Sequence, residues 1–199
     1  MLPAGGGPEE TFAFDTGPGN MVIDQIAERL TGGALRLDPN GEMAAAGTVS
    51  EPLLRRMLRD PFLQKKPPKT TGREDYGEAY TDRILKEAEA LSLSRDSLLA
   101  TVTRFTAECV RIALRDFCPV KPDLLIVGGG GCRNGTLMRE IRGVLDIPVL
   151  TNEDLGLSSD AKEAVAFAVL ANECVRGHTN NLCRVTGAAH PVVMGKISL

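Results

Sequence analysis

The spacing of apolar residues predicts helices along much of the chain. Apolar side chains recur at helical intervals from Val22 to Leu30, after a candidate N-cap at Asn20, until Gly32 and Gly33 end the pattern. A longer stretch places Leu98, Phe105 and other apolar residues on one stripe, which is typical of a helix packed on a neighbouring element. This helix is predicted over Ser94–Asp116, and further helices are predicted over Pro52–Arg59, Arg133–Val144 and Ala161–Glu173. The last is apolar almost all round, so we expect it to be buried.

Short apolar runs predict strands between some of these helices. Asp123–Val127 is continuously apolar after its first residue, as in strands buried on both faces, and Ile147–Leu150 is a second strand. The order strand, helix, strand predicts a parallel sheet and an α/β fold. Thr11–Phe14 is a short strand-like run, and Pro191–Ile197 is a candidate last strand.

Composition limits the classes of function. The 23 basic and 26 acidic residues give a net charge of -3, and no basic cluster predicts a nucleic-acid or membrane partner. Five cysteines without C-x-x-C spacing and two histidines predict reduced thiols rather than a zinc site. Residues 1–10 have the Gly/Pro-rich composition of a flexible tail, without the pattern of a signal peptide, so we expect one cytoplasmic domain over residues 11–199.

The loop Asp15-Thr16-Gly17-Pro18-Gly19-Asn20 lies between a strand-like run and a predicted helix. Its glycines leave backbone N–H groups accessible, and the helix N-terminus adds partial positive charge, so the loop suits a phosphate group. Asp15 is positioned to hold Mg²⁺ directly or through water. The alternative is an ordinary turn into a helix capped by Asn20.

A run of four glycines, Gly128, Gly129, Gly130 and Gly131, follows the apolar strand. It matches neither the dinucleotide fingerprint nor the P-loop, but bare backbone at the carboxyl end of a buried strand can accept a flat ligand. Asn134 could then contact a ribose or a base. The alternative is a plain strand-to-helix connection.

Polar side chains in two further segments have either a structural role or a role in binding a ligand. Pro67–Glu74 offers Lys69, Arg73 and two threonines to an anion or a sugar, or is simply a solvated loop. Glu163 stands three residues after Asp160, which is the spacing of a capping box, so it either satisfies a helix start or faces a ligand.

Taken together, five segments in order resemble the anhydro-N-acetylmuramic acid kinase family. The resemblance extends from about Phe12 to the C-terminus and rests on long, unusual strings: Phe14–Asn20, Pro67–Glu74, Ile126–Asn134, Ser158–Ala171 and Asn181–Ala188. Members of this family belong to the sugar kinase/Hsp70/actin superfamily. They use ATP and Mg²⁺ to open the 1,6-anhydro ring of anhydro-N-acetylmuramic acid with water and to phosphorylate O6, a step in cell-wall sugar recycling.

The resemblance implies a ribonuclease-H-like, actin-like ATPase lobe that is incomplete at its N-terminus. It makes Asp15–Asn20 a phosphate-binding loop, Gly128–Gly131 with Asn134 the adenosine-binding segment, and Glu163 a sugar ligand. The family's first phosphate loop, Gly-Thr-Ser-x-Asp-Gly, has no counterpart here, and the resemblance places the general base upstream, so no catalytic residue is assigned in this chain.

From these departures we expect the C-terminal half of a kinase that is inactive without its N-terminal lobe. An apolar face left by that lobe could lead to a homo-oligomer. A non-catalytic nucleotide-binding or interaction module is the alternative function, and a degenerate remnant is a third interpretation.

Overall fold

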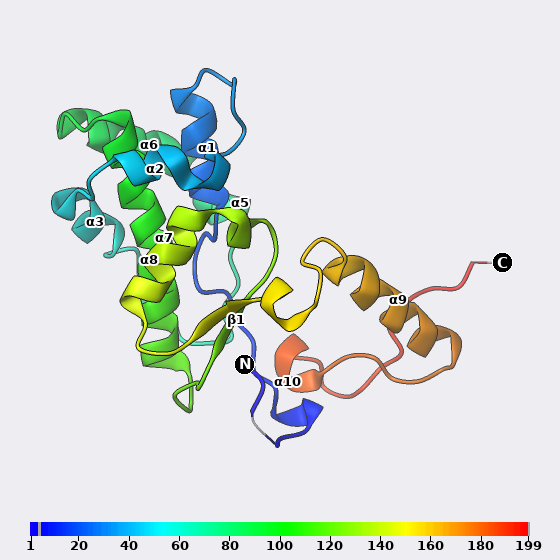
Figure 1. Ribbon diagram of the computed structural model, residues 1–199. Helices are drawn as coiled ribbons and strands as arrows, with labels where there is room; N and C mark the ends of the chain where they lie inside the picture. The colour runs from blue at the N-terminus through cyan, green and yellow to red at the C-terminus, as the bar shows by residue number, and fades with distance from the viewer. Residues whose placement is uncertain (4, 199) are drawn as a thin grey trace. The chain divides into compact units, whose positions relative to one another are not determined.

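The computed structural model describes residues 1–3 and 5–198 and divides the chain into two compact units. The helical unit is Asp15–Thr151, and the terminal unit combines Met1–Phe14 with Asn152–Leu199. The class is α/β, with mostly helices and a small parallel sheet (Figure 1). The predicted division into a tail of residues 1–10 and a lobe of residues 11–199 stays a prediction.

The helical unit contains eight of the labelled α-helices and both strands in the described part of the chain. Their bounds are α1 (Met21–Leu30), α2 (Glu42–Ala46), α3 (Glu51–Met57), α4 (Pro61–Gln64), α5 (Arg73–Tyr76), α6 (Glu78–Ala90), α7 (Arg95–Phe117), β1 (Leu125–Val127), α8 (Gly135–Val144) and β2 (Val149–Thr151). Short 3₁₀ turns η2 (Pro39–Gly41) and η3 (Gly130–Arg133) precede α2 and α8.

Helix α7 is the centre of this unit (Figure 1), and α1, α2, α3, α4 and α8 all pack against it. Ser94 caps it by accepting a hydrogen bond from the Ser97 amide at 3.1 Å. Its residues Leu99, Val102 and Phe105 are fully buried, which confirms the apolar stripe read from the sequence. In the described part of the chain every buried apolar side chain lies between Val22 and Val149, so the core belongs to the helical unit.

The sheet is smaller than the sequence predicts. Strands β1 and β2 are parallel, with Leu125 opposite Val149 and Val127 opposite Thr151, so the predicted strand–helix–strand unit is confirmed. Each strand has only three residues, and Ile126 is 46% exposed, so the prediction that Asp123–Val127 is buried on both faces is wrong. A two-stranded sheet offers few neighbours to cover its faces.

The terminal unit consists of η1 (Pro8–Glu10), η4 (Glu153–Leu155), α9 (Lys162–Val175) and α10 (Cys183–Thr186), and η1 contacts α10. The strands predicted at Thr11–Phe14 and Pro191–Ile197 are wrong, because both segments lack strand pairing in the described chain. Helix α9 has the predicted position but no buried residue, and Phe167 is 71% exposed. The predicted burial of α9 is therefore wrong: its unit has too few elements to cover it.

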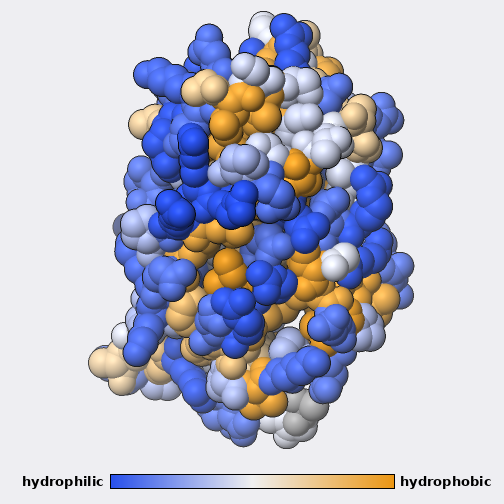
Figure 2. Space-filling model, turned by 90° about the vertical axis from the view of Figure 1, so that its left-hand side faces the viewer, coloured by the Kyte–Doolittle hydropathy of each residue, from blue (hydrophilic) through white to orange (hydrophobic). Residues whose placement is uncertain are grey.

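The surface alternates between charged and apolar residues. On the face shown in Figure 2, hydrophobic side chains gather in patches separated by hydrophilic ones. Within residues 1–3 and 5–198, every helix is too short or too polar to reach across a lipid bilayer.

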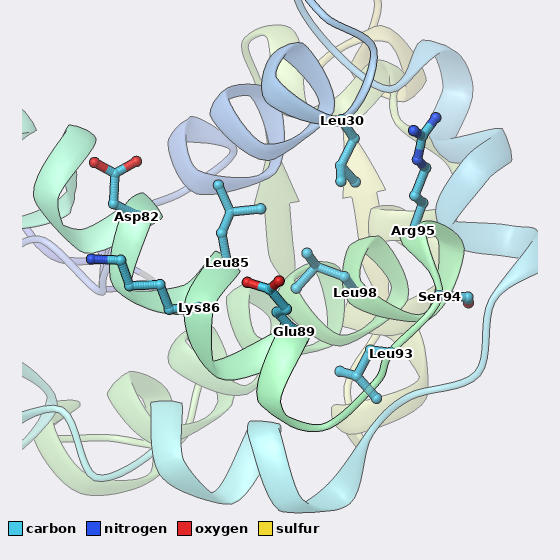
Figure 3. Close-up of a pocket in the computed structure, with 9 residues that line it drawn as sticks. All are labelled: Leu30, Asp82, Leu85, Lys86, Glu89, Leu93, Ser94, Arg95 and Leu98. Carbon is cyan, nitrogen blue, oxygen red and sulfur yellow. The ribbon is translucent and has the colours of Figure 1, made fainter.

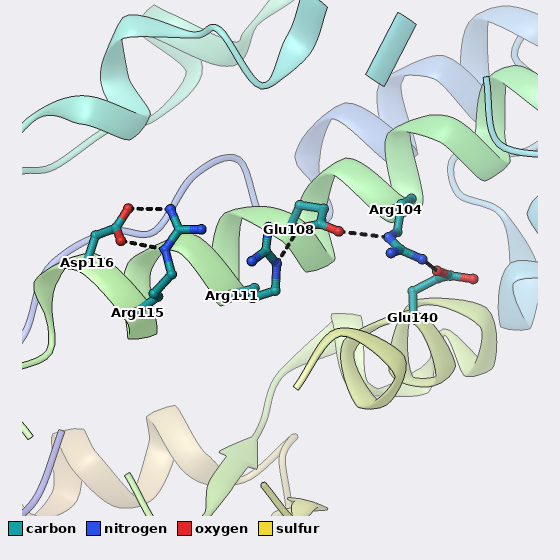
Figure 4. Close-up of polar contacts among 6 residues, drawn as sticks. All are labelled: Arg104, Glu108, Arg111, Arg115, Asp116 and Glu140. Carbon is teal, nitrogen blue, oxygen red and sulfur yellow. Dashed lines mark hydrogen bonds and ion pairs between the residues drawn. The ribbon is translucent and has the colours of Figure 1, made fainter. Parts of the chain in front are cut away.

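An ion-pair network joins the two helices that form the middle of the helical unit. Arg104 of α7 donates to Glu108 on the same helix and to Glu140 of α8, both at 3.1 Å, and Arg111 also pairs with Glu108 (Figure 4). Glu108 is only 7% exposed, so its carboxylate has little contact with water and is paired with Arg104 and Arg111 instead. Arg115 and Asp116, in contrast, form an exposed pair at the end of α7.

Arg104→Ala should lower the free energy of unfolding by about 1 to 2 kcal/mol, because it removes the link between α7 and α8 and leaves Glu108 with one partner. Arg115→Ala is the matched control and should change it by less than about 0.5 kcal/mol, as for exposed pairs. Urea denaturation followed by circular dichroism measures both. Equal losses in the two variants would contradict this account of the network.

Candidate nucleotide-binding site

The loop Asp15–Asn20 lies against the segment Pro67–Glu74. The Asp15 amide donates to the Lys69 carbonyl oxygen at 3.1 Å, and the Thr71 amide donates to Asp15 Oδ2 at 2.9 Å. Two motifs that are far apart in the sequence therefore form one structure. Asp15 itself is exposed, so its carboxylate is held by Thr71 through one oxygen while remaining open to solvent.

Helix α7 supports this loop from the core side. Thr106 Oγ1 donates to the Gly19 carbonyl oxygen at 2.8 Å. A Cβ atom on Gly17 would lie 3.0 Å from Cys109 Sγ, tighter than most contacts of a side chain, so glycine favours this close approach. The loop is thus fixed at its middle by contacts with one buried helix.

The outer side of the loop is open. Gly19 has a φ of 59°, and a Cβ atom there would meet nothing within 4 Å. Asn20 is the N-cap residue of α1, as predicted, but its side chain makes no capping hydrogen bond. Its side chain instead donates to Asp24 Oδ2. In the first turn of α1 the Met21 amide donates to the Pro18 carbonyl oxygen at 3.1 Å, which leaves the Val22 and Ile23 amides without a side-chain cap, as at a helix start that can accept an anion.

Asp24 lies in the first turn of α1, beside this opening. Burial raises the pKa of Asp24 to about 6, against the opposing effect of the hydrogen bond from Asn20. The carboxyl group is thus mostly ionised at neutral pH, although its surroundings favour the neutral form.

The glycine run follows β1 at its carboxyl end, as predicted. Gly129 has a φ of 89°, and Cβ atoms on Gly129 or Gly130 would meet nothing within 4 Å. The backbone here is therefore open. Asn134 caps α8 by accepting from the Leu137 amide at 2.9 Å, so its Oδ1 atom already has a structural role. Contact of Asn134 with a ribose or base stays a prediction, as does the adenosine role of Gly128–Gly131.

A turn that sequence reasoning missed supports the start of α8. Asn40 Oδ1 accepts from the Gly135 amide at 3.2 Å, and Thr136 Oγ1 donates to the Gly41 carbonyl oxygen at 2.7 Å. The buried Asp38 carboxylate accepts from the first amides of α2. The sequence could have predicted this turn, because Asp38-Pro39-Asn40-Gly41 has the composition typical of turns. It positions α2 next to the residues that follow the glycine run.

Pro67–Glu74 is not a freely solvated loop. Lys69 is 7% exposed, with its ammonium group over the rings of Phe62 and Phe117, so it is enclosed rather than presented to an anion. Thr71 Oγ1 donates to Asp75 at 2.8 Å. For Lys69 the interpretation as a solvated residue is therefore wrong, whereas binding of an anion or a sugar by this segment stays a prediction. The enclosure of Lys69 was not readable from the sequence.

Glu163 lies in the first turn of α9, in the terminal unit. The N-cap of α9 is Ala161 and makes no side-chain capping bond, so the predicted capping box with Asp160 as the cap is wrong. Glu163 is exposed. Its role as a sugar ligand stays a prediction.

A separate groove of about 380 Å³ lies elsewhere on the helical unit, between α1, α6 and α7 (Figure 3). Leucines and charged side chains both line it, and Glu89 lies between Leu85 and Leu98. It contains none of the predicted site residues; its lining comprises Leu30, Asp82, Leu85, Lys86, Glu89, Leu93, Ser94, Arg95 and Leu98. The candidate site is therefore an open loop surface and not this groove.

Asp24→Asn should stabilise the protein at pH 7.5. Because the pKa of Asp24 rises on folding from its usual 3.8 to about 6, the folded state binds the proton more tightly. Stability from this group is present below about pH 4 and is lost as pH rises through 6. The variant should gain about 1 to 2 kcal/mol at pH 7.5 and nothing below pH 4.

Denaturant titrations at several pH values measure this difference. Glu28→Gln, an exposed change on the same helix, is the control and should leave the dependence on pH unaltered. A gain by Asp24→Asn that is the same at all pH values would contradict the assigned cause.

Comparison with known proteins relates the whole chain to one family. The family model described as "Anhydro-N-acetylmuramic acid kinase" matches residues 6–199. Relatives named anhydro-N-acetylmuramic acid kinase include one from Caldanaerobacter subterraneus subsp. tengcongensis, 50% identical over 202 residues, and one from Salinibacter ruber, 44% identical over 204 residues. Both alignments cover 100% of this chain, but only 51% and 50% of the relatives.

A third relative of the same name, from Bacillus cereus (strain G9842), is 43% identical over 203 residues, which is 52% of its length. The chain thus spans about half the length of the curated relatives it matches. The match nevertheless extends over nearly every residue, including both loops that meet at Asp15. This chain belongs to the anhydro-N-acetylmuramic acid kinase family.

Proposed function

We propose that the chain is the ATP-binding, C-terminal half of an anhydro-N-acetylmuramic acid kinase. The observation that carries this proposal is the loop Asp15–Asn20, fixed to α7 by Thr106 and open at Gly19 beside an uncapped helix start. Such a loop fits the phosphates of a nucleotide. In this interpretation the small parallel sheet is part of a ribonuclease-H-like lobe, with the open glycine run Gly128–Gly131 and Asn134 at the adenosine.

The residues present also fit Mg²⁺. Mg²⁺ is commonly held by one or two carboxylates together with substrate phosphates, and needs no cage made wholly of protein. Asp15 has one oxygen on the Thr71 amide and an exposed carboxylate, so it can hold the ion at the phosphate loop. When bound, Mg²⁺ neutralises charge on the phosphate oxygens. The ionised carboxylate of Asp24, in the first turn of α1, repels an anion at this helix start. Neutralisation of the phosphate charge by Mg²⁺ would reduce that repulsion.

The proposed reaction consumes water, ATP and anhydro-N-acetylmuramic acid. Water opens the 1,6-anhydro ring, the γ-phosphoryl group passes to O6, and ADP leaves with the 6-phosphate product. Because phosphoryl transfer depends on positioning and charge stabilisation, we expect it to need groups from the half of the relatives' length that this chain does not span. Glu163 is the proposed sugar ligand in this chain.

Gly19→Val should weaken MgATP binding at least tenfold, about 1.4 kcal/mol. Valine places a branched side chain in the open space over the loop and resists the positive φ of this residue. Calorimetric titration of the chain with MgATP measures the effect. Gly32→Val is a matched control, because Gly32 also has a positive φ of 64° and open space but lies at the other end of α1.

The control should keep the MgATP affinity of the wild type despite similar backbone strain. Unchanged affinity in a folded Gly19→Val variant would refute the phosphate-loop assignment. An equal loss in both variants would mean that strain, and not occupation of the site, causes the effect.

Catalysis should appear when the chain is mixed with the N-terminal half of the Caldanaerobacter relative. With ATP, Mg²⁺ and the anhydro sugar, mass spectrometry should detect the 6-phosphate, and the chain alone should give none. Glu163→Gln should reduce turnover at least tenfold. Glu173→Gln, which changes the last turn of the same helix, should not. A mixture that binds MgATP yet forms no product would favour a non-catalytic nucleotide-binding module.

A further inference from the structure

Lys69 occupies an unusual place for a lysine. It is 7% exposed, and its Nζ atom lies 4.8 Å from the centre of the Phe62 ring and 4.3 Å from that of Phe117. Nζ also donates to the Phe62 carbonyl oxygen at 3.3 Å. Both distances to the rings are within the range of a cation–π interaction, which is stronger when water is excluded. The side chain is therefore held on two sides.

The two rings belong to different elements. Phe62 is in α4, where it packs edge-on against Tyr76 with ring centres 6.0 Å apart. Phe117 is the last residue of α7. The lysine thus ties the segment that follows α4 to the end of the central helix. Burial lowers the pKa of Lys69 from its ordinary value, which is the cost of this arrangement.

The backbone of the same segment determines where Asp15 lies. The Lys69 carbonyl oxygen accepts from the Asp15 amide at 3.1 Å, and two residues later the Thr71 amide donates to Asp15 Oδ2 at 2.9 Å. One bond fixes the Asp15 backbone, and the other fixes its carboxylate. Any movement of residues 69–71 would therefore change the direction of the carboxylate.

We propose that Lys69 is a positioning residue, whose contacts with Phe62 and Phe117 orient the Asp15 carboxylate for a magnesium-bound nucleotide. This role rests on the proposed function, since it gives Asp15 its ligand. It differs from binding the phosphates directly, because the ammonium group faces aromatic rings and a backbone carbonyl oxygen. It also differs from simple filling of the core, because methionine would fill similar space without holding the two rings electrostatically.

The test replaces Lys69 by Met, with Lys66→Met as the control on an exposed neighbour in the same segment. The first readout is the hydrogen-exchange rate of the Thr71 amide, followed by NMR without nucleotide. In the wild type this amide should exchange slowly, because its proton is bonded to the Asp15 carboxylate. In Lys69→Met it should exchange at least tenfold faster, while Lys66→Met should match the wild type.

The second readout is calorimetric titration with MgATP and with adenosine. Lys69→Met should weaken MgATP binding at least tenfold and adenosine binding less than twofold. Lys69→Arg, whose guanidinium group can also stack on the rings, should restore part of the behaviour of the Thr71 amide and part of the MgATP affinity. If Lys69→Met does not fold, Phe117→Leu removes one of the two rings that contact Lys69. It should change the Thr71 amide and the MgATP affinity in the same direction as Lys69→Met, but by less.

The outcomes separate the two proposals. A wild-type chain that does not bind MgATP would refute the proposed function, whatever the NMR signals show. Wild-type binding together with unchanged Thr71 amide exchange in folded Lys69→Met and Phe117→Leu would overturn the positioning role alone. Unchanged MgATP affinity in those variants would overturn it as well.

Discussion

The burial of α7 is the constraint on which the rest of the helical unit depends. Five other helices pack on it, and its buried residues form the largest single part of the core. The same helix supplies Thr106 and Cys109 beneath the loop at Gly17 and Gly19, and Phe117 against Lys69. A helix of 23 residues with little freedom to move can fix several loops at once. The candidate site is rigid on its inner side for this reason.

Much of the helical unit could be predicted from the sequence, because its signals are local. The apolar stripes of α1 and α7 are periodic patterns, and they predicted the bounds of these two helices nearly correctly. The order strand, helix, strand predicted the parallel pairing of β1 and β2. Both motif loops were also recognised. Their contact through Thr71 and Asp15 was not, since a hydrogen bond between residues 56 positions apart leaves no local pattern. The enclosure of Lys69 was missed for the same reason.

The errors in the terminal unit have a different physical origin. An apolar helix such as α9 indicates that something should cover it, but not that the covering elements are present. The prediction of burial assumed a complete core, whereas the described residues of this unit contain no buried apolar side chain. The capping-box spacing at Asp160 likewise shows that a local pattern can be present without the expected bond, because α9 begins one residue later.

The two pieces of the terminal unit come from opposite ends of the sequence, on either side of the helical unit. Its internal contacts, such as that of η1 with α10, therefore close a loop that contains the entire helical unit. Loop closure of this kind is less unfavourable once the intervening chain is compact. The described residues of the terminal unit contain no buried apolar side chain, so we expect this unit to open more readily than the helical unit. Glu163 lies in this unit, so we expect the amides around it to exchange hydrogen faster than those of α7.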